Sequence, residues 1–461
     1  MSLFPKSLLI ANRGEIARRI IRTAKRLGVH TVAVYHAVDG NLPYVLEADT
    51  AIQLEGDTPV QAYLDGEQIV RIAKDAGATA IHPGYGFLAE NAGFARRVEE
   101  AGLIWVGPSA EVIEVMGDKV ESRRAVAAAG VPISGDAGAA LQTGDEAVEE
   151  AKRVGYPVMV KASAGGGGIG MAVAHDEEAL RKAFENTRSM AARSFDSDRV
   201  FVERFVASAR HIEIQVLGLA DGTVVALGER DCSTQRRHQK LIEESPAPHL
   251  DQELRGRLIE CAIASAAAVG YRNAGTVEFL LDTISGDFVF LEMNTRIQVE
   301  HPITELTHGV DLVEQQLSIA ASGTTTPDFA PEARGHAIEL RICAEDPKKF
   351  FPRPGPIDAW QEPAGPGIRV DSGYAAGTEV TPHFDSLVAK VCAYGATREE
   401  ALARAIKACN DFVIEGLTTN RPFLEEILGS EEFTEGRYDT GVVAEIQQRL
   451  KEEARLAKRS A

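Results

Sequence analysis

The feature that most restricts how this chain can fold is a hairpin-like sequence, T-V-E-F-L-L-D-T-I-S-G-D-F-V-F-L-E, at residues 276–292. Its two apolar runs flank Ile284-Ser285-Gly286, a pattern that predicts two antiparallel strands joined by a short turn. A hairpin centred on Ser285 places Glu278 directly opposite Glu292. Like charges that face each other on one side of a strand pair are destabilising by up to about 1 kcal/mol. We therefore expect a cation between these two carboxylates.

The residues that follow, E-M-N-T-R-I-Q-V-E at 292–300, alternate polar with mostly apolar side chains. In an extended chain successive side chains point to opposite faces, so the polar ones share one face. This polar row consists of Glu292, Asn294, Arg296, Gln298 and Glu300. Its oxygen atoms suit Mg²⁺ or Mn²⁺, which complete their coordination with water and substrate phosphates. A solvated edge strand would show the same alternation, but the facing carboxylates favour the metal site.

Length and composition exclude several functional classes. A chain of 461 residues is too long for one core and predicts two to four domains. Its formal net charge of −19 argues against a general nucleic-acid or anionic-membrane binder. The 5 cysteines lack C-x-x-C spacing, so neither a zinc site nor a disulfide framework is indicated. With no secretory signal and no apolar run near about 18 residues, we expect a cytoplasmic protein without a membrane span.

The order of the predicted elements divides the chain into four segments. Residues 1–117 alternate short apolar strands with amphipathic helices, which is typical of a doubly wound parallel sheet. Residues 118–333 combine a glycine loop, helices and the hairpin, and include a small lobe at about 134–206. Residues 334–448 form a C-terminal α+β domain, and residues 449–461 form a charged tail.

A glycine-rich stretch, K-A-S-A-G-G-G-G-I-G-M at 161–171, follows the predicted strand Y-P-V-M-V. Closely spaced glycines let backbone N–H groups approach phosphate oxygens, and Lys161 adds positive charge. The stretch is not a Walker A loop, because no G-K-[S/T] follows. We predict a nucleotide-binding loop here, with a mobile surface loop as the alternative.

Cationic side chains gather in G-E-R-D-C-S-T-Q-R-R-H-Q-K at 228–240, within an otherwise acidic chain. We expect them to bind a small anionic substrate beside a metal nucleotide. The loop H-P-G-Y-G-F-L-A-E-N at 82–91 follows a predicted parallel strand, at the end where such sheets bind ligands. Further on, I-E-L-R-I at 338–342 places Glu339 and Arg341 on one face of a strand. Arginine stays charged at neutral pH, so Arg341 would stabilise an anion or form a structural ion pair.

Seven motifs in this order closely resemble those of biotin carboxylase, the ATP-grasp component of biotin-dependent carboxylases. They are R-G-E-I-A, H-P-G-Y-G-F-L-A-E-N, M-G-D-K, K-A-S-x-G-G-G-G, E-R-D-C-S-x-Q-R-R-H-Q-K, E-M-N-T-R-I-Q-V-E-H-P-x-T-E and A-E-D-P, and they span about residues 6–445. The resemblance implies an α/β, three-domain ATP-grasp enzyme. Its parts would be a Rossmann-like N-terminal domain, a central ATP-grasp domain whose mobile glycine-loop lobe closes over ATP, and a C-terminal α+β domain. It also implies a homodimer.

The resemblance further implies roles for individual residues. Those expected to bind ATP are Lys119, Lys161, Gly166, Gly167, Gly168, Glu203, Val206, His211, Gln235, His238, Glu278 and Glu292. The ligands expected for Mg²⁺ or Mn²⁺ are Glu278, Glu292 and Asn294. Those expected to bind bicarbonate and biotin are Tyr85, Lys240, Arg296, Gln298, Val299, Glu300 and Arg341.

Four of these residues are implied to be catalytic. Lys240 and Arg296 would gather bicarbonate, and Glu300 would deprotonate it for attack on the γ-phosphate. The resulting carboxyphosphate would release CO₂ and phosphate, and the phosphate would remove the N1′ proton of biotin. Arg341 would then stabilise the biotin enolate. A straight strand from Glu292 to Glu300 would span about 25 Å, too far for a base acting at a metal-bound phosphate. We therefore expect a bend near Arg296.

The sequence contains no A-M-K-M-type biotinyl lysine and no carboxyltransferase region. Biotin is therefore expected on a separate carrier protein, and a carboxyltransferase is expected as a second partner. The favoured assembly is an acyl-CoA carboxylase, such as the acetyl-CoA carboxylase of fatty acid biosynthesis. Two alternatives are an ATP-grasp ligase that joins a carboxylate to an amine and a non-catalytic regulatory homologue. Departures from the family pattern, which bear on ATP affinity and dimer strength, are Arg26, Ile169, Asn273 and Cys343.

Overall fold

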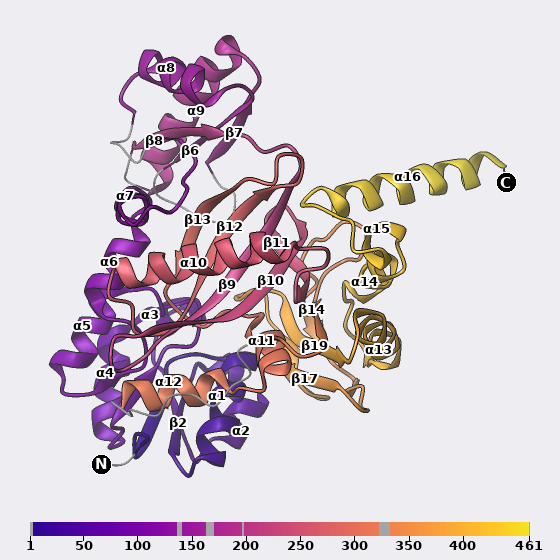
Figure 1. Cartoon of the computed structure of the whole chain (residues 1–461). Helices are drawn as coiled ribbons and strands as arrows, with labels where there is room; N and C mark the ends of the chain where they lie inside the picture. The colour runs from indigo at the N-terminus through magenta and orange to yellow at the C-terminus, as the bar shows by residue number, and fades with distance from the viewer. Residues whose placement is uncertain (1–2, 136–140, 163–169, 196–197, 322–331, 461) are drawn as a thin grey trace.

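The computed structural model describes residues 3–135, 141–162, 170–195, 198–321 and 332–460. Figure 1 shows a small lobe at the top, a large twisted sheet in the centre, the N-terminal part of the chain below it and a group of C-terminal helices at one side. Among the described helices, none has both the length and the apolar character needed to cross a bilayer.

The N-terminal part contains a fully parallel five-stranded sheet in the order β3-β2-β1-β4-β5, as predicted. Its strands are β1 (Ser7–Ile10), β2 (His30–Tyr35), β3 (Thr50–Gln53), β4 (Ala80–His82) and β5 (Ile104–Trp105). Strand β3 is a short edge strand whose side chains are all at least partly exposed, so its sequence carries no strong apolar signal. The helices around this sheet are α1 (Gly14–Arg26), α2 (Pro43–Glu47), α3 (Pro59–Leu64), α4 (Gly66–Asp75), α5 (Ala92–Glu100) and α6 (Ala110–Gly117).

The small lobe has its own sheet and core. Strands β6 (Val158–Ala162), β7 (Met171–Ala174) and β8 (Val200–Arg204) pair in the order β7-β6-β8. Helices α8 (Gly144–Val154) and α9 (Glu177–Phe195) pack on this sheet, and α7 (Lys119–Ala128) leads into the lobe (Figure 1). Phe184, Val158 and Val200 are fully buried between the helices and the sheet.

The central sheet has eight strands in the order β13-β12-β9-β10-β11-β14-β19-β17, and every neighbouring pair is antiparallel. Its strands are β9 (Ala209–Gly218), β10 (Val224–Arg236), β11 (Gln239–Ser245), β12 (Asn273–Asp282), β13 (Phe288–Asn294), β14 (His336–Cys343), β17 (Ile368–Ser372) and β19 (Leu387–Gly395). Pairing of β11 with β14 carries the sheet across the predicted domain boundary at residue 333. The predicted central and C-terminal domains therefore share one sheet.

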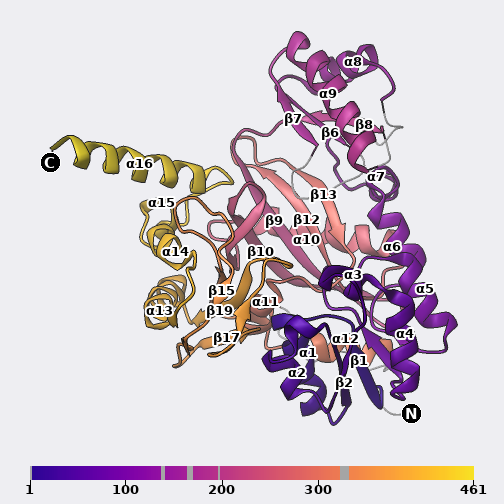
Figure 2. The same cartoon turned by 180° about the vertical axis from the view of Figure 1, so that it is seen from behind.

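The remaining elements cover this sheet and its C-terminal end. They are α10 (Gln252–Ala268), α11 (His301–His308), α12 (Leu312–Ala320), β15 (Gly355–Pro356), β16 (Ala359–Gln361), β18 (Glu379–Val380), α13 (Arg398–Asp411), β20 (Val413–Glu415), α14 (Arg421–Leu428), α15 (Glu431–Thr434) and α16 (Val442–Ser460). The predicted charged tail is the outer part of α16, which projects from the molecule (Figures 1 and 2). Buried Val442, Val443 and Ile446 anchor the start of that helix, and Arg449 further along pairs with Glu432.

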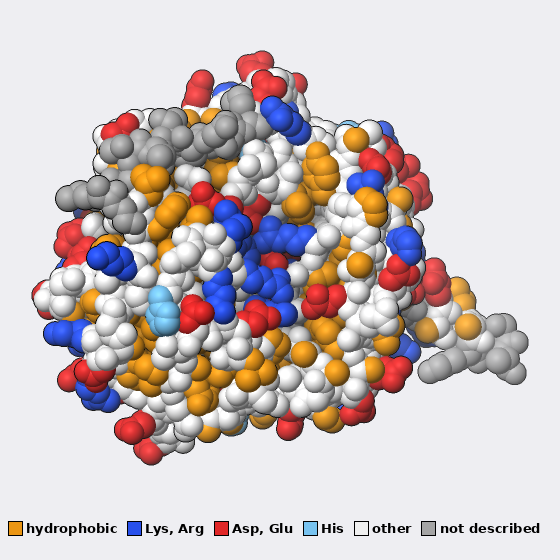
Figure 3. Space-filling view, turned by 90° about the horizontal axis from the view of Figure 1, so that it is seen from below, with side chains coloured by type: hydrophobic (Ala, Val, Ile, Leu, Met, Phe, Trp, Pro, Cys, Tyr) orange, Lys and Arg blue, Asp and Glu red, His pale blue; other side chains and the backbone are white. Residues whose placement is uncertain are grey.

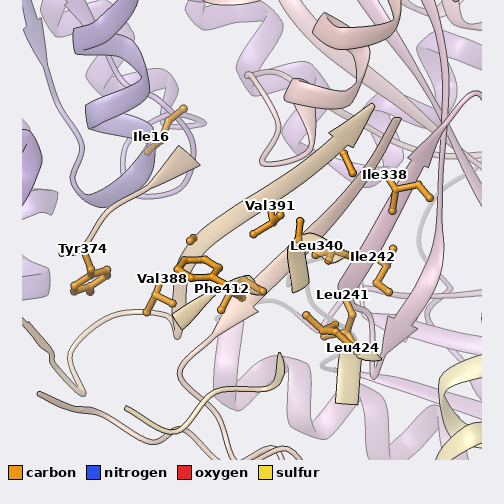
Figure 4. Packing of buried hydrophobic residues seen from close by; sticks show 14 of the residues in the cluster. Ile16, Leu241, Ile242, Ile338, Leu340, Tyr374, Val388, Val391, Phe412 and Leu424 are labelled. Carbon is orange, nitrogen blue, oxygen red and sulfur yellow. The ribbon is translucent and has the colours of Figure 1, made fainter. Parts of the chain in front are cut away.

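One apolar core ties the N-terminal and C-terminal parts to the central sheet. It contains Ile16 of α1, Leu241 of β11, Leu340 of β14, Val391 of β19 and Leu424 of α14 (Figure 4). These side chains come from segments more than 400 residues apart in the sequence, yet all are at most 2% exposed. The core fixes α1, β11, β14 and β19 relative to one another, and these four elements supply much of the site described below.

Glu244 of β11 anchors the C-terminal helices to this sheet. Its buried carboxylate accepts hydrogen bonds from His336 Nε2 at 2.6 Å and Arg398 Nε at 2.7 Å, and from the Tyr438 hydroxyl. Burial opposes ionisation, but the hydrogen bonds from His336 and Arg398 outweigh it and lower the pKa of Glu244 to about 2. The carboxylate therefore stabilises the fold above its ordinary pKa, and this contribution is lost as the pH falls toward 2.

We expect Glu244→Gln to lower the free energy of unfolding at pH 7 by about 3–5 kcal/mol, because it removes the buried carboxylate that pairs with Arg398 and accepts from His336 and Tyr438. Urea unfolding followed by circular dichroism would measure this loss. Glu260→Gln, an exposed change on α10, is the matched control and is expected to stay within about 0.5 kcal/mol of the unmodified chain. Equal unfolding free energies for both variants would contradict the anchoring role.

Candidate active site

The structure confirms the predicted hairpin register: Glu278 of β12 pairs directly with Glu292 of β13. A bulge follows, so that Phe279 faces Phe290 where an unbroken ladder would place Leu291. The carboxylates are part of a longer line of cross-strand neighbours. Glu278 also lies beside Glu213 of β9, which in turn lies beside Arg230 of β10. The sheet thus places three glutamates and one arginine side by side across four strands.

The predicted bend after the hairpin is also present. Strand β13 ends at Asn294, the chain bends at Thr295 and Arg296, and it turns again at Val299 and Glu300 before α11 begins. As a result, Glu278 on the hairpin and Glu300 after the bend contact the same ammonium group. Lys240 Nζ lies 3.1 Å from Glu278 Oε1 and 2.6 Å from Glu300 Oε1.

Lys240 is the centre of a buried charge cluster. Besides Glu278 and Glu300, its ammonium group contacts Glu213 Oε2 at 2.6 Å. Burial would lower the pKa of Lys240, but the surrounding acidic groups, these glutamates among them, raise it well above its ordinary value. Glu213 also accepts a hydrogen bond from Arg230, which is fully buried and donates to Gln215 Oε1 at 2.8 Å. Sequence reasoning missed Glu213, because H-I-E-I-Q-V reads as an ordinary alternating strand.

Glu300 is fully buried between two cations. Lys240 donates to Oε1, and Arg341 Nη2 donates to Oε2 at 2.8 Å. Burial alone would raise the pKa of Glu300, but Lys240 and Arg341 hold it well below its usual range. The side chain is therefore an ionised carboxylate whose two oxygens are both oriented, which is the state a proton acceptor requires.

The rest of the polar row gathers around Glu278. Asn294 Nδ2 and Gln298 Nε2 each donate to Glu278 Oε1 at 2.9 Å. Arg296 Nη2 donates to Asn294 Oδ1 at 2.9 Å. The guanidinium of Arg296 also contacts Glu90 Oε2 at 2.9 Å, so the loop at 82–91 reaches the site. Sequence reasoning singled out that loop without assigning Glu90 to the site.

The predicted metal ligands have unequal surroundings. Glu278 is already held by Lys240 and by His211 Nε2 at 2.9 Å, and its pKa is lowered well below the ordinary value despite burial. The pKa of Glu292 is raised, first by its partial removal from water and then by the charge of Glu278. Glu292 still reaches solvent, so hydration weakens the first effect. A solvent-reaching carboxylate that lies beside Asn294 and opposite a second glutamate fits Mg²⁺ or Mn²⁺.

Two other compact groups with metal-ligand geometry occur among the described residues. They are His211, Glu213 and Glu278, and Glu213, Cys232 and Glu300. The ammonium group of Lys240 contacts Glu213 and Glu278 of the first group, and Glu213 and Glu300 of the second. A lysine therefore already supplies the positive charge at both places. The set predicted from the sequence, Glu278 with Glu292 and Asn294, therefore remains a prediction.

Several predicted nucleotide residues face one another on the small lobe and on the helix that leads into it. Lys161 Nζ on β6 lies 2.5 Å from Glu203 Oε2 on β8, and Arg123 of α7 contacts the same carboxylate. Lys119, at the start of α7, interacts with both Glu203 and Glu292, and burial lowers its pKa. This arrangement links the lobe to the carboxylate pair of the hairpin.

The turn between β10 and β11 faces the same region. His238 has a positive φ of 68°, and burial followed by the charges of Lys161 and His211 lowers its pKa. Gln235 is buried on β10, and Val206 is half-buried just after β8. Gly166, Gly167, Gly168 and Ile169 lie outside the described residues.

On the other side of Glu300, three parts of the chain meet through a buried lysine. Lys390 of β19 is fully buried, donates to the Val299 carbonyl at 2.7 Å and lies 3.1 Å from Glu15 Oε2 of α1. The Tyr85 hydroxyl donates to Glu15. The structure thus connects Tyr85 and Val299 through Glu15 and Lys390. Sequence reasoning missed both connecting residues, because neither lies in a stretch with unusual charge.

The departures from the family pattern have simple structural surroundings. Asn273 has a φ of 79°, a conformation that glycine adopts most easily and asparagine tolerates, and its Nδ2 donates to the Gln316 carbonyl at 3.0 Å. Cys343 is buried, and its backbone N–H donates to Asn420 Oδ1 at 2.8 Å. Arg26 is half exposed and pairs with Asp311 and Glu314 of the same chain. Of these three residues, none is part of the charge cluster around Lys240 in the described structure.

Comparisons with known proteins agree with this architecture. Three family models match: "Biotin carboxylase, N-terminal domain" at residues 5–113, "Carbamoyl-phosphate synthase L chain, ATP binding domain" at 118–327, and "Biotin carboxylase C-terminal domain" at 339–445. Biotin carboxylase 2 of Bacillus subtilis is 49% identical over 435 residues, which cover 94% of this chain and 98% of the relative. A pyruvate carboxylase subunit of Methanothermobacter thermautotrophicus is 45% identical, with 98% of this chain and 94% of the relative covered.

Solved structures give the same result. A biotin carboxylase from Campylobacter jejuni in complex with β,γ-ATP superposes with a TM-score of 0.92 at 41% identity, covering 96% of this chain and 99% of that one. The biotin carboxylase domain dimer of the Hydrogenobacter thermophilus 2-oxoglutarate carboxylase, bound to MgADP, ADP and bicarbonate, has a TM-score of 0.91 at 44% identity, with 96% and 98% covered. The chain therefore belongs to the biotin carboxylase family of ATP-dependent ligases, which carboxylate biotin with ATP and bicarbonate.

Proposed function

We propose that this chain catalyses the first half-reaction of a biotin-dependent carboxylase, with biotin carried on a separate carrier protein. One observation supports this most strongly: Glu300 is a fully buried carboxylate held between Lys240 and Arg341, at the point where the polar row turns back toward Glu278. The proposed base, the two cations proposed to bind anions and a carboxylate proposed for the nucleotide site are therefore adjacent. The relative that holds MgADP and bicarbonate together supports the same combination of ligands.

In this proposal Glu300 removes the proton from bicarbonate. Without substrate, Lys240 and Arg341 keep Glu300 ionised, which makes it a weak base. A bound bicarbonate anion would share these cations and add its own negative charge, and both effects raise the pKa of Glu300. The proton affinity of the base thus increases when the substrate is in place. Lys240 and Arg296 supply positive charge, and Gln298 and Val299 complete the bicarbonate pocket.

The nucleotide would lie between the hairpin and the small lobe. Its triphosphate would contact Lys119, Lys161, His211, Gln235 and His238. Glu203 and Val206 would lie at the adenine, and Gly166, Gly167 and Gly168 would cover the phosphates. When bound, Mg²⁺ or Mn²⁺ would neutralise phosphate charge at Glu278, Glu292 and Asn294.

Attack of the deprotonated bicarbonate on the γ-phosphate would break its bond to the β-phosphate and give ADP and carboxyphosphate, which breaks down to CO₂ and phosphate. The phosphate would accept the N1′ proton of biotin, and the deprotonated N1′ would form a bond to the CO₂ carbon, which gives carboxybiotin. Arg341 would stabilise the developing negative charge on the ureido oxygen, because its guanidinium faces the same space as Glu300. Tyr85 would line the biotin site.

The final carboxyl acceptor depends on the carboxyltransferase partner. We propose an acyl-CoA carboxylase, with acetyl-CoA carboxylase as the example. The relatives also include proteins of a pyruvate carboxylase and of a 2-oxoglutarate carboxylase, so those acceptors are the competing candidates. Identifying the biotinylated protein that co-purifies with this chain would distinguish them.

We also propose a homodimer, as in the dimeric relative. Lys and Arg side chains gather near the middle of the face shown in Figure 3, at the end of the molecule that carries the N-terminal sheet. On α1, Arg22, Lys25 and Arg26 are each more than 40% exposed. Each of these cations lies within 4 Å of a carboxylate of its own chain, namely Asp371, Asp49 and Asp311, so the charge of α1 is largely balanced within one copy.

The activity test is direct. We expect the purified chain, supplied with ATP, Mg²⁺ and bicarbonate, to release ADP at a rate that free biotin increases. A coupled assay for ADP with and without bicarbonate would measure this. Equal ADP release with and without bicarbonate would contradict the proposal. Stimulation by an amino acid instead of biotin would indicate the alternative ligase that joins a carboxylate to an amine.

A further inference from the structure

Two glutamates that the proposed reaction does not use face each other beside the active site. Glu243 of β11 and Glu339 of β14 are direct cross-strand neighbours, and both are at most 1% exposed. Such neighbours have Cβ atoms about 4.5–5.5 Å apart, and two like charges at this separation destabilise the strand pair. The sequence showed only one of them as notable, because the register of β11 against β14 is a tertiary feature.

The hydrogen bonds of this pair are incomplete. Glu243 Oε1 accepts from Arg341 Nε, and Glu339 Oε2 lies 3.4 Å from the Cys392 Sγ atom. The second oxygen of each residue, Glu243 Oε2 and Glu339 Oε1, is buried without a hydrogen-bond partner in the described part of the chain. A buried ionised carboxylate with a bare oxygen is costly, whereas a protonated carboxyl group can donate to a neighbouring carboxylate.

The charged groups around the pair do not supply enough positive charge for two carboxylates. Facing Glu243 are Arg341 and Glu339 of β14, Lys240 of β11 and Glu300 before α11. Facing Glu339 are Lys390 of β19, Glu243, Arg341, Glu300 and the Cys392 thiol. Of the three cations, Arg341 also contacts Glu300, Lys240 contacts three other glutamates, and Lys390 contacts Glu15.

The contacts also indicate which member is neutral. Glu243 has a direct ion pair with Arg341, which favours its charged form. Among the described residues, Glu339 has only a thiol within hydrogen-bond distance, which stabilises a carboxylate weakly. Burial is the largest cause that raises the pKa of both residues, to about 7 for Glu243 and well above the ordinary value for Glu339. Both shifts agree with a pair that retains a proton at neutral pH.

We propose that Glu243 and Glu339 share a single proton, held mainly on Glu339, and that the negative charge left on Glu243 fixes the guanidinium of Arg341 throughout the reaction. Glu243 is then a positioning residue for Arg341. Because Glu339 carries the proton and is neutral, Glu243 can stay charged without repulsion from its neighbour. This inference rests on the proposed function, in which Arg341 acts on biotin.

The arrangement matters because Glu300 changes its charge during the proposed reaction. Arg341 bridges the two carboxylates, with Nε toward Glu243 and Nη2 toward Glu300. When Glu300 takes a proton from bicarbonate, its attraction for Arg341 falls. The contact with Glu243 remains, so the guanidinium keeps its place when the charge on biotin develops. The position of Arg341 therefore does not depend on whether Glu300 is protonated.

Two matched variants test the division of roles. Glu243→Gln removes the charge behind Arg341, so we expect the biotin-dependent rate to fall by about 100-fold, the size expected for a displaced catalytic group. The bicarbonate-dependent ADP release without biotin should fall by less than about fivefold. Glu339→Gln imitates the neutral acid and should keep the biotin-dependent rate within about threefold. Steady-state kcat and KM for biotin, with circular dichroism spectra of each variant, would measure these effects.

A measurement of stability against pH provides a readout independent of activity. A carboxyl group whose pKa is raised by folding contributes stability below its ordinary pKa, and this contribution is lost as the pH rises through the raised value. The melting temperature of the unmodified chain should therefore decrease between pH 6 and pH 9. In Glu339→Gln the neutral amide leaves Glu243 ionised without a repelling neighbour, so this decrease should be smaller.

The outcomes separate this inference from the proposed function. If the unmodified chain shows no ADP release that depends on bicarbonate and biotin, the proposed function fails first. If the chain is active but both variants lose the biotin-dependent rate equally, or Glu339→Gln loses more, the shared-proton assignment is wrong. An unchanged pH dependence of melting in Glu339→Gln would also overturn it.

Discussion

Replacing Glu300 with glutamine should lower bicarbonate-dependent ADP release by at least about 10³-fold, the upper part of the range for removing a general base. Glutamine preserves the shape of the side chain but cannot accept a proton. It would also leave Lys240 and Arg341 each without one of their carboxylate partners, so bicarbonate should still be attracted to them. Turnover should therefore fail at the chemical step and not at substrate binding.

The diagnostic measurement is nucleotide affinity. We expect Glu300→Gln to bind ATP with Mg²⁺ within about threefold of the unmodified chain, because Glu300 is not among the expected nucleotide contacts. Equilibrium titration followed by fluorescence or calorimetry would show this, with Glu260→Gln on α10 as the control for a remote glutamate. Loss of ATP binding together with turnover would contradict the role of Glu300 as a base and indicate a structural one.

The part of the site that the sequence predicted is the part encoded by local spacing. The pairing of Glu278 with Glu292 follows from a short turn, and a hairpin with a fixed turn has few alternative registers. The bend near Arg296 followed from a distance argument that uses the role the family resemblance implies for Glu300: a straight strand could not bring this base to the phosphate. The hairpin register required only nearby residues, whereas the bend also required the resemblance.

The part that was missed depends on tertiary register. Glu213 joins the site because β9 lies between β12 and β10, and Lys390 joins it because β19 lies beside β14. Alternating strands such as H-I-E-I-Q-V predict a strand but not its neighbours. Register also joins the central and C-terminal segments, because the pairing of β11 with β14 carries one sheet across residue 333; the domain boundary there stays a prediction.

These missed residues explain why the site holds so much buried charge. Each glutamate near Lys240 has its own cation from another strand: Arg230 for Glu213, His211 for Glu278 and Arg341 for Glu300. A single cation could not stabilise three buried carboxylates. With these partners in place, Lys240 can contact all three glutamates. Replacing Lys240 therefore tests the whole cluster.

Replacing Lys240 with glutamine should have the largest combined effect on stability and activity. The change leaves Glu213, Glu278 and Glu300 without the ammonium group they share, so we expect the free energy of unfolding to fall by about 3–5 kcal/mol. Bicarbonate-dependent ADP release should fall to background. Lys407→Gln is the matched control: Lys407 is 72% exposed and pairs only with Asp411 among the described ion pairs, so its loss should cost less than about 1 kcal/mol.

A second substitution separates the two effects. Adding Glu213→Gln to Lys240→Gln removes one of the uncompensated carboxylates, and it should restore about 1–2 kcal/mol of the lost unfolding free energy, within the range for coupled neighbours. It should not restore activity, because the bicarbonate pocket still lacks its ammonium group. Denaturant unfolding and the ADP assay on the three variants measure both quantities. If the double variant regained activity together with stability, Lys240 would act only by stabilising the fold. If stability and activity were the same in the double variant as in Lys240→Gln, Lys240 and Glu213 would not be energetically coupled.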